Sequence, residues 1–72
     1  MNYKICYFRP DGTAAAIPIT ANNIDEAVSI LFSKTDILLR FTEGKEQKNI
    51  LLCDDSGLIV RTADLISGTV TG

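Results

Sequence analysis

Residues 23–32 read Asn-Ile-Asp-Glu-Ala-Val-Ser-Ile-Leu-Phe and contain the helical pattern around which the fold is organised. Apolar side chains recur at positions 24, 27, 28, 31 and 32, a spacing that places them on one stripe of a helix. Asn23 suits the N-cap position, and Glu26 three residues later can complete a capping box. We therefore predict one amphipathic helix that begins after Asn23 and ends near Ser33 or Lys34.

The segment before this helix predicts a β-hairpin. Tyr3 to Phe8 is rich in aromatic residues, which favour strands. Residues 9–12, Arg-Pro-Asp-Gly, favour a tight turn because proline presets its φ angle and glycine follows. The returning strand spans residues 13–19. Pro18 lacks an N–H group, so this strand is expected at an edge of the sheet.

Three more strands are predicted after the helix, at residues 36–42, 48–53 and 58–61, with a short helical turn over 63–66. Short turns between strands favour antiparallel pairing, and one helix must cover one face of the sheet. The expected fold class is therefore α+β in the order β-β-α-β-β-β, a small antiparallel sheet with one helix packed on one face. Residues 1–68 are expected to form a single domain and residues 69–72 a flexible C-terminal tail.

The composition excludes several kinds of site. The 72 residues include no histidine and two cysteines, Cys6 and Cys53, which is too few for a structural zinc site or a disulfide framework. We expect no metal and no cofactor. The net charge of −2 and a pI near 4.8 argue against nucleic-acid binding, because domains that bind nucleic acids are usually basic. The sequence shows neither a signal peptide nor a membrane-spanning run, so a cytoplasmic protein without membrane contact is expected.

Catalytic groups are sparse, and we predict that the chain is not an enzyme. A nucleophilic cysteine or serine normally needs a base beside it, and histidine is absent. Both cysteines fall in apolar strands, where a thiol is expected to behave as a small hydrophobic group. Asp54 and Asp55 are interpreted as part of a turn with Ser56 and Gly57.

The apolar content favours a protein-interaction module. Hydrophobic residues make up 46% of the chain and the mean hydropathy is +0.16, which is high for a domain with so little interior. Leu51 lies between Ile50 and Leu52, so both sides of that predicted strand are apolar, and Leu38 is expected on a second such surface. The first hypothesis is therefore a homodimer that binds an unidentified protein partner through a face or edge of its sheet.

Two alternative functions stay open. The first is a small-ligand or anion-binding module, with Arg40, Lys48 or Arg61 as contacts. The second is a single-stranded nucleic-acid binder in which bases stack on Tyr3 and Tyr7, which share one face of the first strand.

Overall fold

The computed structural model describes residues 1–42 and 49–72. In chain order the described residues form β1 (Asn2–Phe8), β2 (Ala14–Thr20), α1 (Ile24–Ser33), α2 (Thr35–Phe41), β3 (Asn49–Asp54), β4 (Ile59–Asp64) and β5 (Val70–Thr71). This is a small α+β arrangement with an antiparallel sheet, as the sequence predicts, but with two helices instead of one. The link between the predicted strands at 36–42 and 48–53, together with Lys48, lies outside the described residues.

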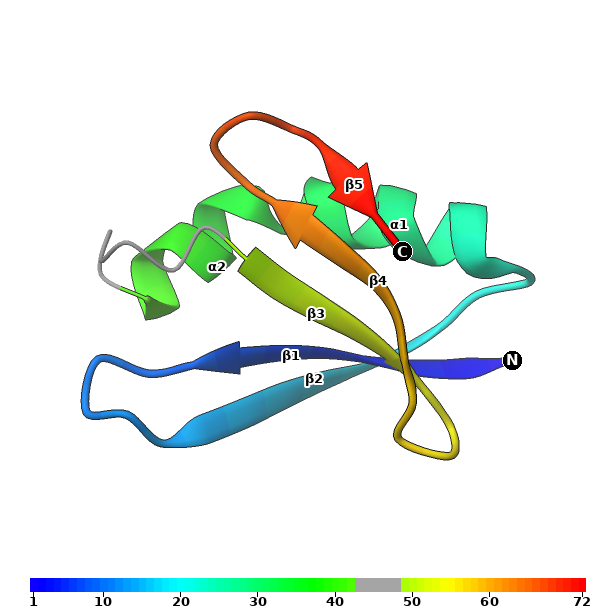
Figure 1. Ribbon diagram of the computed structural model, residues 1–72, viewed down its shortest axis with the longest axis horizontal. Helices are drawn as coiled ribbons and strands as arrows, with labels where there is room; N and C mark the ends of the chain where they lie inside the picture. The colour runs from blue at the N-terminus through cyan, green and yellow to red at the C-terminus, as the bar shows by residue number, and fades with distance from the viewer. Residues whose placement is uncertain (43–48) are drawn as a thin grey trace.

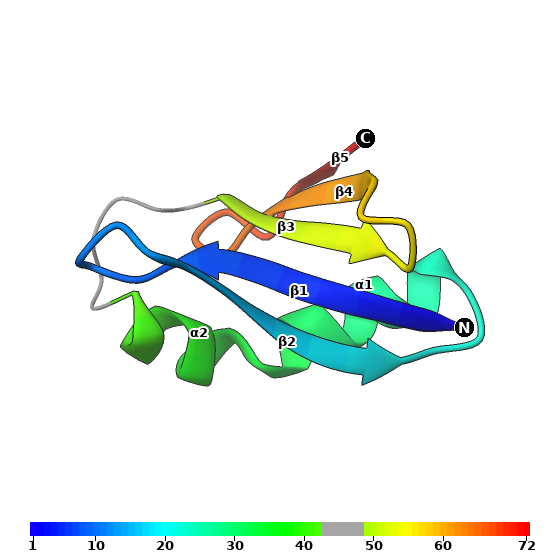
Figure 2. The ribbon, with the colours of Figure 1, turned by 90° about the horizontal axis from the view of Figure 1, so that it is seen from below.

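The five strands form one sheet in the order β2-β1-β3-β4-β5, and every neighbouring pair is antiparallel. The N-terminal strand β1 therefore lies between β2 and β3. Figures 1 and 2 show α1 and α2 on the same side of this sheet. The prediction that Pro18 marks an edge is confirmed, because β2 is an outer strand. We call the side that carries the helices the inner face.

The predicted strand at 36–42 is wrong, because residues 35–41 form the helix α2. Ile37, Leu39 and Phe41 alternate as in a strand, but the buried residues are Leu38 and Thr42, which are four apart and share one side of a helix. Leucine and arginine are also good helix formers. Lys34 joins the helices, since its N–H donates to Leu31 O at the end of α1 and its own carbonyl accepts the N–H of Leu38.

The C-terminal segment also differs from the sequence prediction. β4 continues to Asp64, so the helical turn expected over 63–66 does not form. Asp64 Oδ1 instead accepts the N–H groups of Ile66 and Ser67, which turns the chain back. Residues 70 and 71, expected in a flexible tail, form β5 and pair with residues 63 and 62 of β4.

The core lies between the helices and the inner face. It contains Tyr3, Ile5 and Tyr7 of β1, Ile50 and Leu52 of β3, Ala63 of β4, and Ala27, Leu31 and Leu38 from the helices. The rings of Tyr7 and Phe41 stack with centroids 5.7 Å apart, which fixes α2 against β1. Among the described residues, no buried side-chain nitrogen or oxygen lacks a hydrogen-bond partner. The centre of the inner face is therefore packed against the helices.

The turn between β3 and β4 is organised by the carboxylate of Asp54. Its Oδ1 accepts hydrogen bonds from Ser56 Oγ at 2.6 Å, Ser56 N at 2.9 Å and Leu58 N at 3.0 Å. The Ser56 hydroxyl and these N–H groups hold the pKa of Asp54 below its usual value of 3.8, because they favour the charged form. Asp54 therefore orders the turn, as the sequence indicates.

This carboxylate should make the domain sensitive to acid. Because the folded pKa of Asp54 is lowered, its stabilising contribution is complete above the unfolded pKa and is lost as the pH falls through the folded value. Thermal melts between about pH 5 and pH 2 should show a falling Tm. Asp54→Asn should lower the Tm by a few degrees at neutral pH and weaken the acid dependence.

Asp55→Asn is the matched control, since Asp55 is exposed in the same turn. The control variant should keep both the Tm and the acid dependence of the parent. The Thr13 hydroxyl lowers the pKa of Asp11 in the same way, so part of the acid dependence should persist in both variants. An unchanged pH profile in Asp54→Asn would contradict the role given to Asp54.

Candidate functional site

The side of the sheet opposite the helices forms a continuous, mainly apolar surface, which we call the outer face. Register defines it: Cys6 lies opposite Ala16 on β2 and Leu51 on β3, and Lys4 lies opposite Pro18 and Cys53. Directly paired residues of antiparallel strands point to the same side. Across β2, β1 and β3 the centre of the outer face comprises Lys4, Cys6, Phe8, Ala14, Ala16, Pro18, Leu51 and Cys53, and the polar residues Asn2, Thr20 and Asn49 lie at the strand ends.

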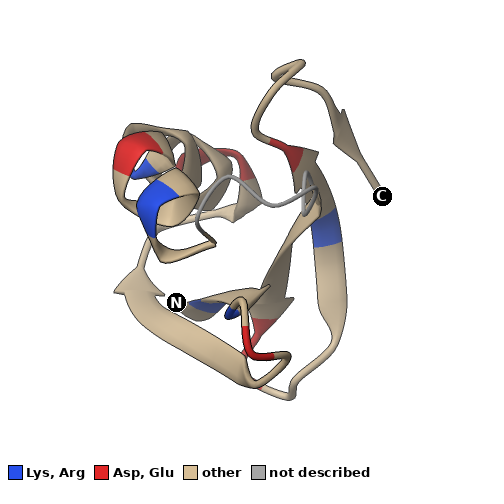
Figure 3. Ribbon diagram, turned by 90° about the vertical axis from the view of Figure 1, so that its left-hand side faces the viewer, with Lys and Arg blue, Asp and Glu red and all other residues tan. Residues whose placement is uncertain are grey.

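The outer face is smooth and carries little charge. Its central β2 positions are two alanines and a proline, and Lys4 is the charged residue at its centre. On β4 the same face continues with Thr62 opposite Leu51 and with Asp64 opposite Asn49. Ile59, which pairs with Cys53 across the β3–β4 ladder, extends the apolar surface and is 57% exposed. In Figure 3 the strands are mostly uncoloured, whereas much of the coloured charge lies on the helices and in the turns. Neither α1 nor α2 covers this face (Figure 2).

The two leucines proposed for a sheet surface lie in different environments. Leu51 is on the outer face and half-buried, as the sequence predicts for a strand with two apolar sides. Leu38 is in α2 and fully buried against the core, so it cannot belong to an exposed sheet face. Its assignment to such a surface followed from the wrong strand at 36–42 and is corrected here.

Tyr3 and Tyr7 share a face of β1, as predicted, but it is the inner face. They are 3% and 8% exposed and pack under the helices. The Tyr3 hydroxyl is directed at Met1 Sδ at 3.8 Å. A nucleic-acid base could stack on these rings only if the helices moved away, so this platform is occupied by the core.

The basic residues proposed for anion binding are not brought together in the described part of the chain. Arg40 is exposed in the last turn of α2, whereas Arg61 lies on β4 beside the start of α1. Lys48 lies outside the described residues. Arg61 Nη1 donates to the carbonyl oxygens of Val60 at 2.6 Å and Gly72 at 3.4 Å, so its guanidinium is partly engaged by backbone.

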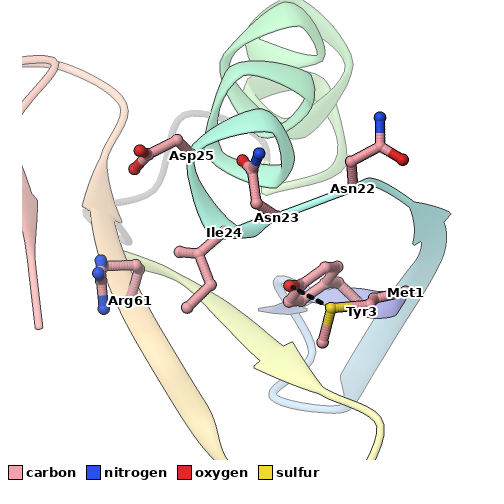
Figure 4. A pocket seen from close by; sticks show the side chains of 7 residues that line it. All are labelled: Met1, Tyr3, Asn22, Asn23, Ile24, Asp25 and Arg61. Carbon is pink, nitrogen blue, oxygen red and sulfur yellow. Dashed lines mark hydrogen bonds between the residues drawn. The ribbon is translucent and has the colours of Figure 1, made fainter.

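A pocket of about 410 Å³ lies beside Arg61, between the N-terminus of α1 and the start of β1. Figure 4 shows the side chain of Ile24 projecting toward the space between Arg61 and Tyr3. Asn23 closes the end of α1, because its Oδ1 accepts the N–H of Glu26 at 2.8 Å. Asp25 also lines the pocket and opposes an anion electrostatically. The pocket therefore offers mixed charge at its rim and no assembled anion site.

The fold brings together two thiols, Cys6 and Cys53, whose Sγ atoms are 3.4 Å apart. Cys6 is half-buried and Cys53 is buried. Burial raises the pKa of the Cys53 thiol to about 11, with a further contribution from its hydrogen bond with Cys6. Sequence reasoning placed both thiols in apolar strands but could not pair them, because their proximity depends on the register of β1 against β3.

Among the described residues, no group of three or more histidine, cysteine, aspartate or glutamate side chains is placed to hold a metal ion. Within the same residues, neither helix has the length and apolar character needed to cross a bilayer. Comparisons of the chain with protein-family models, with curated proteins and with solved structures found no match. The candidate site therefore rests on the chain's own geometry, which singles out the outer face.

Proposed function

We propose that the chain is a non-enzymatic protein-interaction module that forms a homodimer through the outer face of its sheet. The observation that carries this proposal is the one-sided placement of the helices. Both α1 and α2 pack on the inner face, while the outer face presents a mainly apolar centre around Cys6, Ala16 and Leu51, with Lys4 beside it and polar residues at the strand ends. Apolar surfaces that the fold itself leaves uncovered are characteristic of interfaces. The lack of histidine supports the non-enzymatic part.

A second copy of the chain is the partner that this surface suits best. Sheets pack face to face when their side chains interdigitate, and the small side chains of Ala14 and Ala16 allow close approach. A standard interface buries about 800 Å² on each partner. The protein exposes 4501 Å² in all, so such an interface would need roughly a sixth of its surface, a share that one sheet face can supply. Small domains also gain stability from association.

The central test is the substitution Ala16→Asp. Ala16 is exposed on the outer face, midway along the edge strand β2 and opposite Cys6, so a carboxylate there should leave the fold intact. In a dimer the same carboxylate would be buried against an apolar partner, which costs several kcal/mol, on the order of 2–5. Light scattering during size-exclusion chromatography should give twice 7.8 kDa for the parent and a folded monomer for the variant, with dimer dissociation favoured by at least about 30-fold.

Ser29→Asp is the matched control, because Ser29 is exposed on α1, in the helix layer on the opposite side of the sheet. It adds the same charge and should leave the dimer mass unchanged. Circular dichroism on both variants separates lost association from lost folding. A parent protein that stays monomeric at high micromolar concentration would refute the homodimer, and an Ala16→Asp variant that remains dimeric would refute the proposed face.

A further inference from the structure

The two cysteines occupy neighbouring positions on adjacent strands although 47 residues separate them in the sequence. Cys6 pairs with Leu51, and Cys53 is two residues further along β3 on the same side of the sheet. The thiols are thus diagonal neighbours, and they are already in van der Waals contact at 3.4 Å. A disulfide bond is about 2.05 Å long, so closure requires the sulfur atoms to approach by about 1.4 Å.

The backbone around Cys53 can accommodate this movement. The register between β3 and β4 shifts beside Cys53, because Leu52 pairs with Arg61 and Cys53 with Ile59, which leaves Val60 of β4 as the extra residue in the ladder. Cys53 therefore lies where the regular pairing between β3 and β4 is interrupted. Rotation about the two Cα–Cβ bonds and a small shift of β3 supply the remaining approach.

We propose that Cys6 and Cys53 are an oxidation site at which a peroxide converts the two thiols into an intramolecular disulfide. The order of events follows from exposure. In the single chain Cys6 is half-buried and open to a small oxidant, whereas Cys53 is 7% exposed and faces Cys6. Both lie on the outer face that the proposed homodimer would cover, so oxidation is expected of the dissociated chain. Cys6 is therefore oxidised first, and Cys53 is the resolving thiol.

The chemistry balances with hydrogen peroxide as the oxidant. The deprotonated sulfur of Cys6 attacks one peroxide oxygen, the O–O bond breaks, and the released hydroxide takes up a proton to leave as water. Cys6 becomes a sulfenic acid. The sulfur of Cys53 then attacks Cys6 Sγ, the S–O bond breaks, and the departing hydroxide combines with the proton of Cys53 to form a second water. Two electrons pass from the thiol pair to the peroxide.

The second step should be the slower one. The pKa of Cys53 is raised to about 11 by burial and by Cys6, so little of its reactive thiolate is present at neutral pH. The sulfenic acid on Cys6 should therefore live long enough to be trapped by a carbon nucleophile such as dimedone. Once formed, the disulfide ties β1 to β3 across a long loop that contains both helices.

Intact mass spectrometry of the reduced full chain, before and after peroxide, tests the proposal. We expect a monomer lighter by about 2 Da, a cross-linked peptide pair that contains Cys6 and Cys53, and a Tm raised by about 10 °C or more through the constrained unfolded chain. Reduction should reverse all three. In Cys53→Ser, dimedone should label Cys6, whereas in the matched variant Cys6→Ser it should leave Cys53 unlabelled.

Other products would overturn the proposal. Mass gains of about 16 or 32 Da without loss of two hydrogens would show that the thiols oxidise separately. Covalent dimers would show that the disulfide forms between chains, and an unreactive protein would show that the pair is inert. The reaction should be repeated on Ala16→Asp. Because the disulfide is intramolecular, it should form in this variant whether or not the homodimer proposal holds.

Discussion

Leu38→Asp is expected to abolish folding at 25 °C. Leu38 is a residue of α2, and its side chain is fully buried in the core. The Thr42 hydroxyl donates a hydrogen bond to the Leu38 carbonyl at 3.0 Å. A carboxylate at this site would have no water and no buried cation, a cost that typically exceeds about 4 kcal/mol. A domain of this length has a total stability of about 4–11 kcal/mol. The far-ultraviolet circular dichroism and amide proton dispersion of the variant should be those of an unfolded chain.

Ile37→Asp is the adjacent control. Ile37 precedes Leu38 in the same helix but is 45% exposed, and an acidic side chain in the first turns of a helix interacts favourably with the helix dipole. The urea midpoint of Ile37→Asp should correspond to a free energy of unfolding within about 1 kcal/mol of the parent's. If both variants folded equally well, residues 35–41 would not present Leu38 to the core, and the helical assignment of this segment would be wrong.

Leu52→Ala should lose about 2–5 kcal/mol of unfolding free energy. Leu52 is fully buried on the inner face of β3 and pairs with Ile5 of β1 on one side and Arg61 of β4 on the other. Its removal leaves a cavity among residues that two strands hold in place, so little relaxation is available. Urea denaturation at a concentration where the parent is a single species gives the difference from the shift in midpoint.

Leu51→Ala provides the comparison, because it deletes the same atoms from the next residue and from the opposite face. Leu51 is half-buried on the outer face, so the monomer should lose about 1 kcal/mol or less. If the two substitutions proved equally costly in the monomer, both faces of β3 would be packed to the same degree. The one-sided sheet on which the proposed function depends would then be ruled out.

The sequence correctly predicts the elements that are determined by residues close together in the chain. The helix over 24–33 begins where Asn23 predicts, because the Asn23 side chain accepts the N–H of Glu26. The capping box is incomplete, since Glu26 accepts from Asn22 Nδ2. The hairpin turns where proline and glycine favour it, with Gly12 N donating to Arg9 O and a φ of 88° at Gly12.

The sequence prediction of residues 35–41 was wrong because their apolar pattern fits both the period of a strand and the period of a helix. In residues 35–41 the apolar side chains at 37, 39 and 41 alternate, but Leu38 is apolar as well, and burial of that residue selects the helix. Strand register is a second property that local patterns leave open. The sequence shows that both sides of the strand around Leu51 are apolar, whereas the contact between Cys6 and Cys53 depends on which residues of β1 and β3 meet.

The position of β1 between β2 and β3 has a consequence for how the chain acquires its structure. β1 pairs with β2 through a short hairpin, but its other side pairs with β3, with Tyr3 opposite Asp54. During synthesis the pairing between β1 and β3 can therefore form only after most of the chain has been made. Until then the hairpin is an open template for pairing with other chains. The folding rate and the aggregation during expression should consequently depend on how quickly β3 pairs with β1, more than on the stability of the finished sheet.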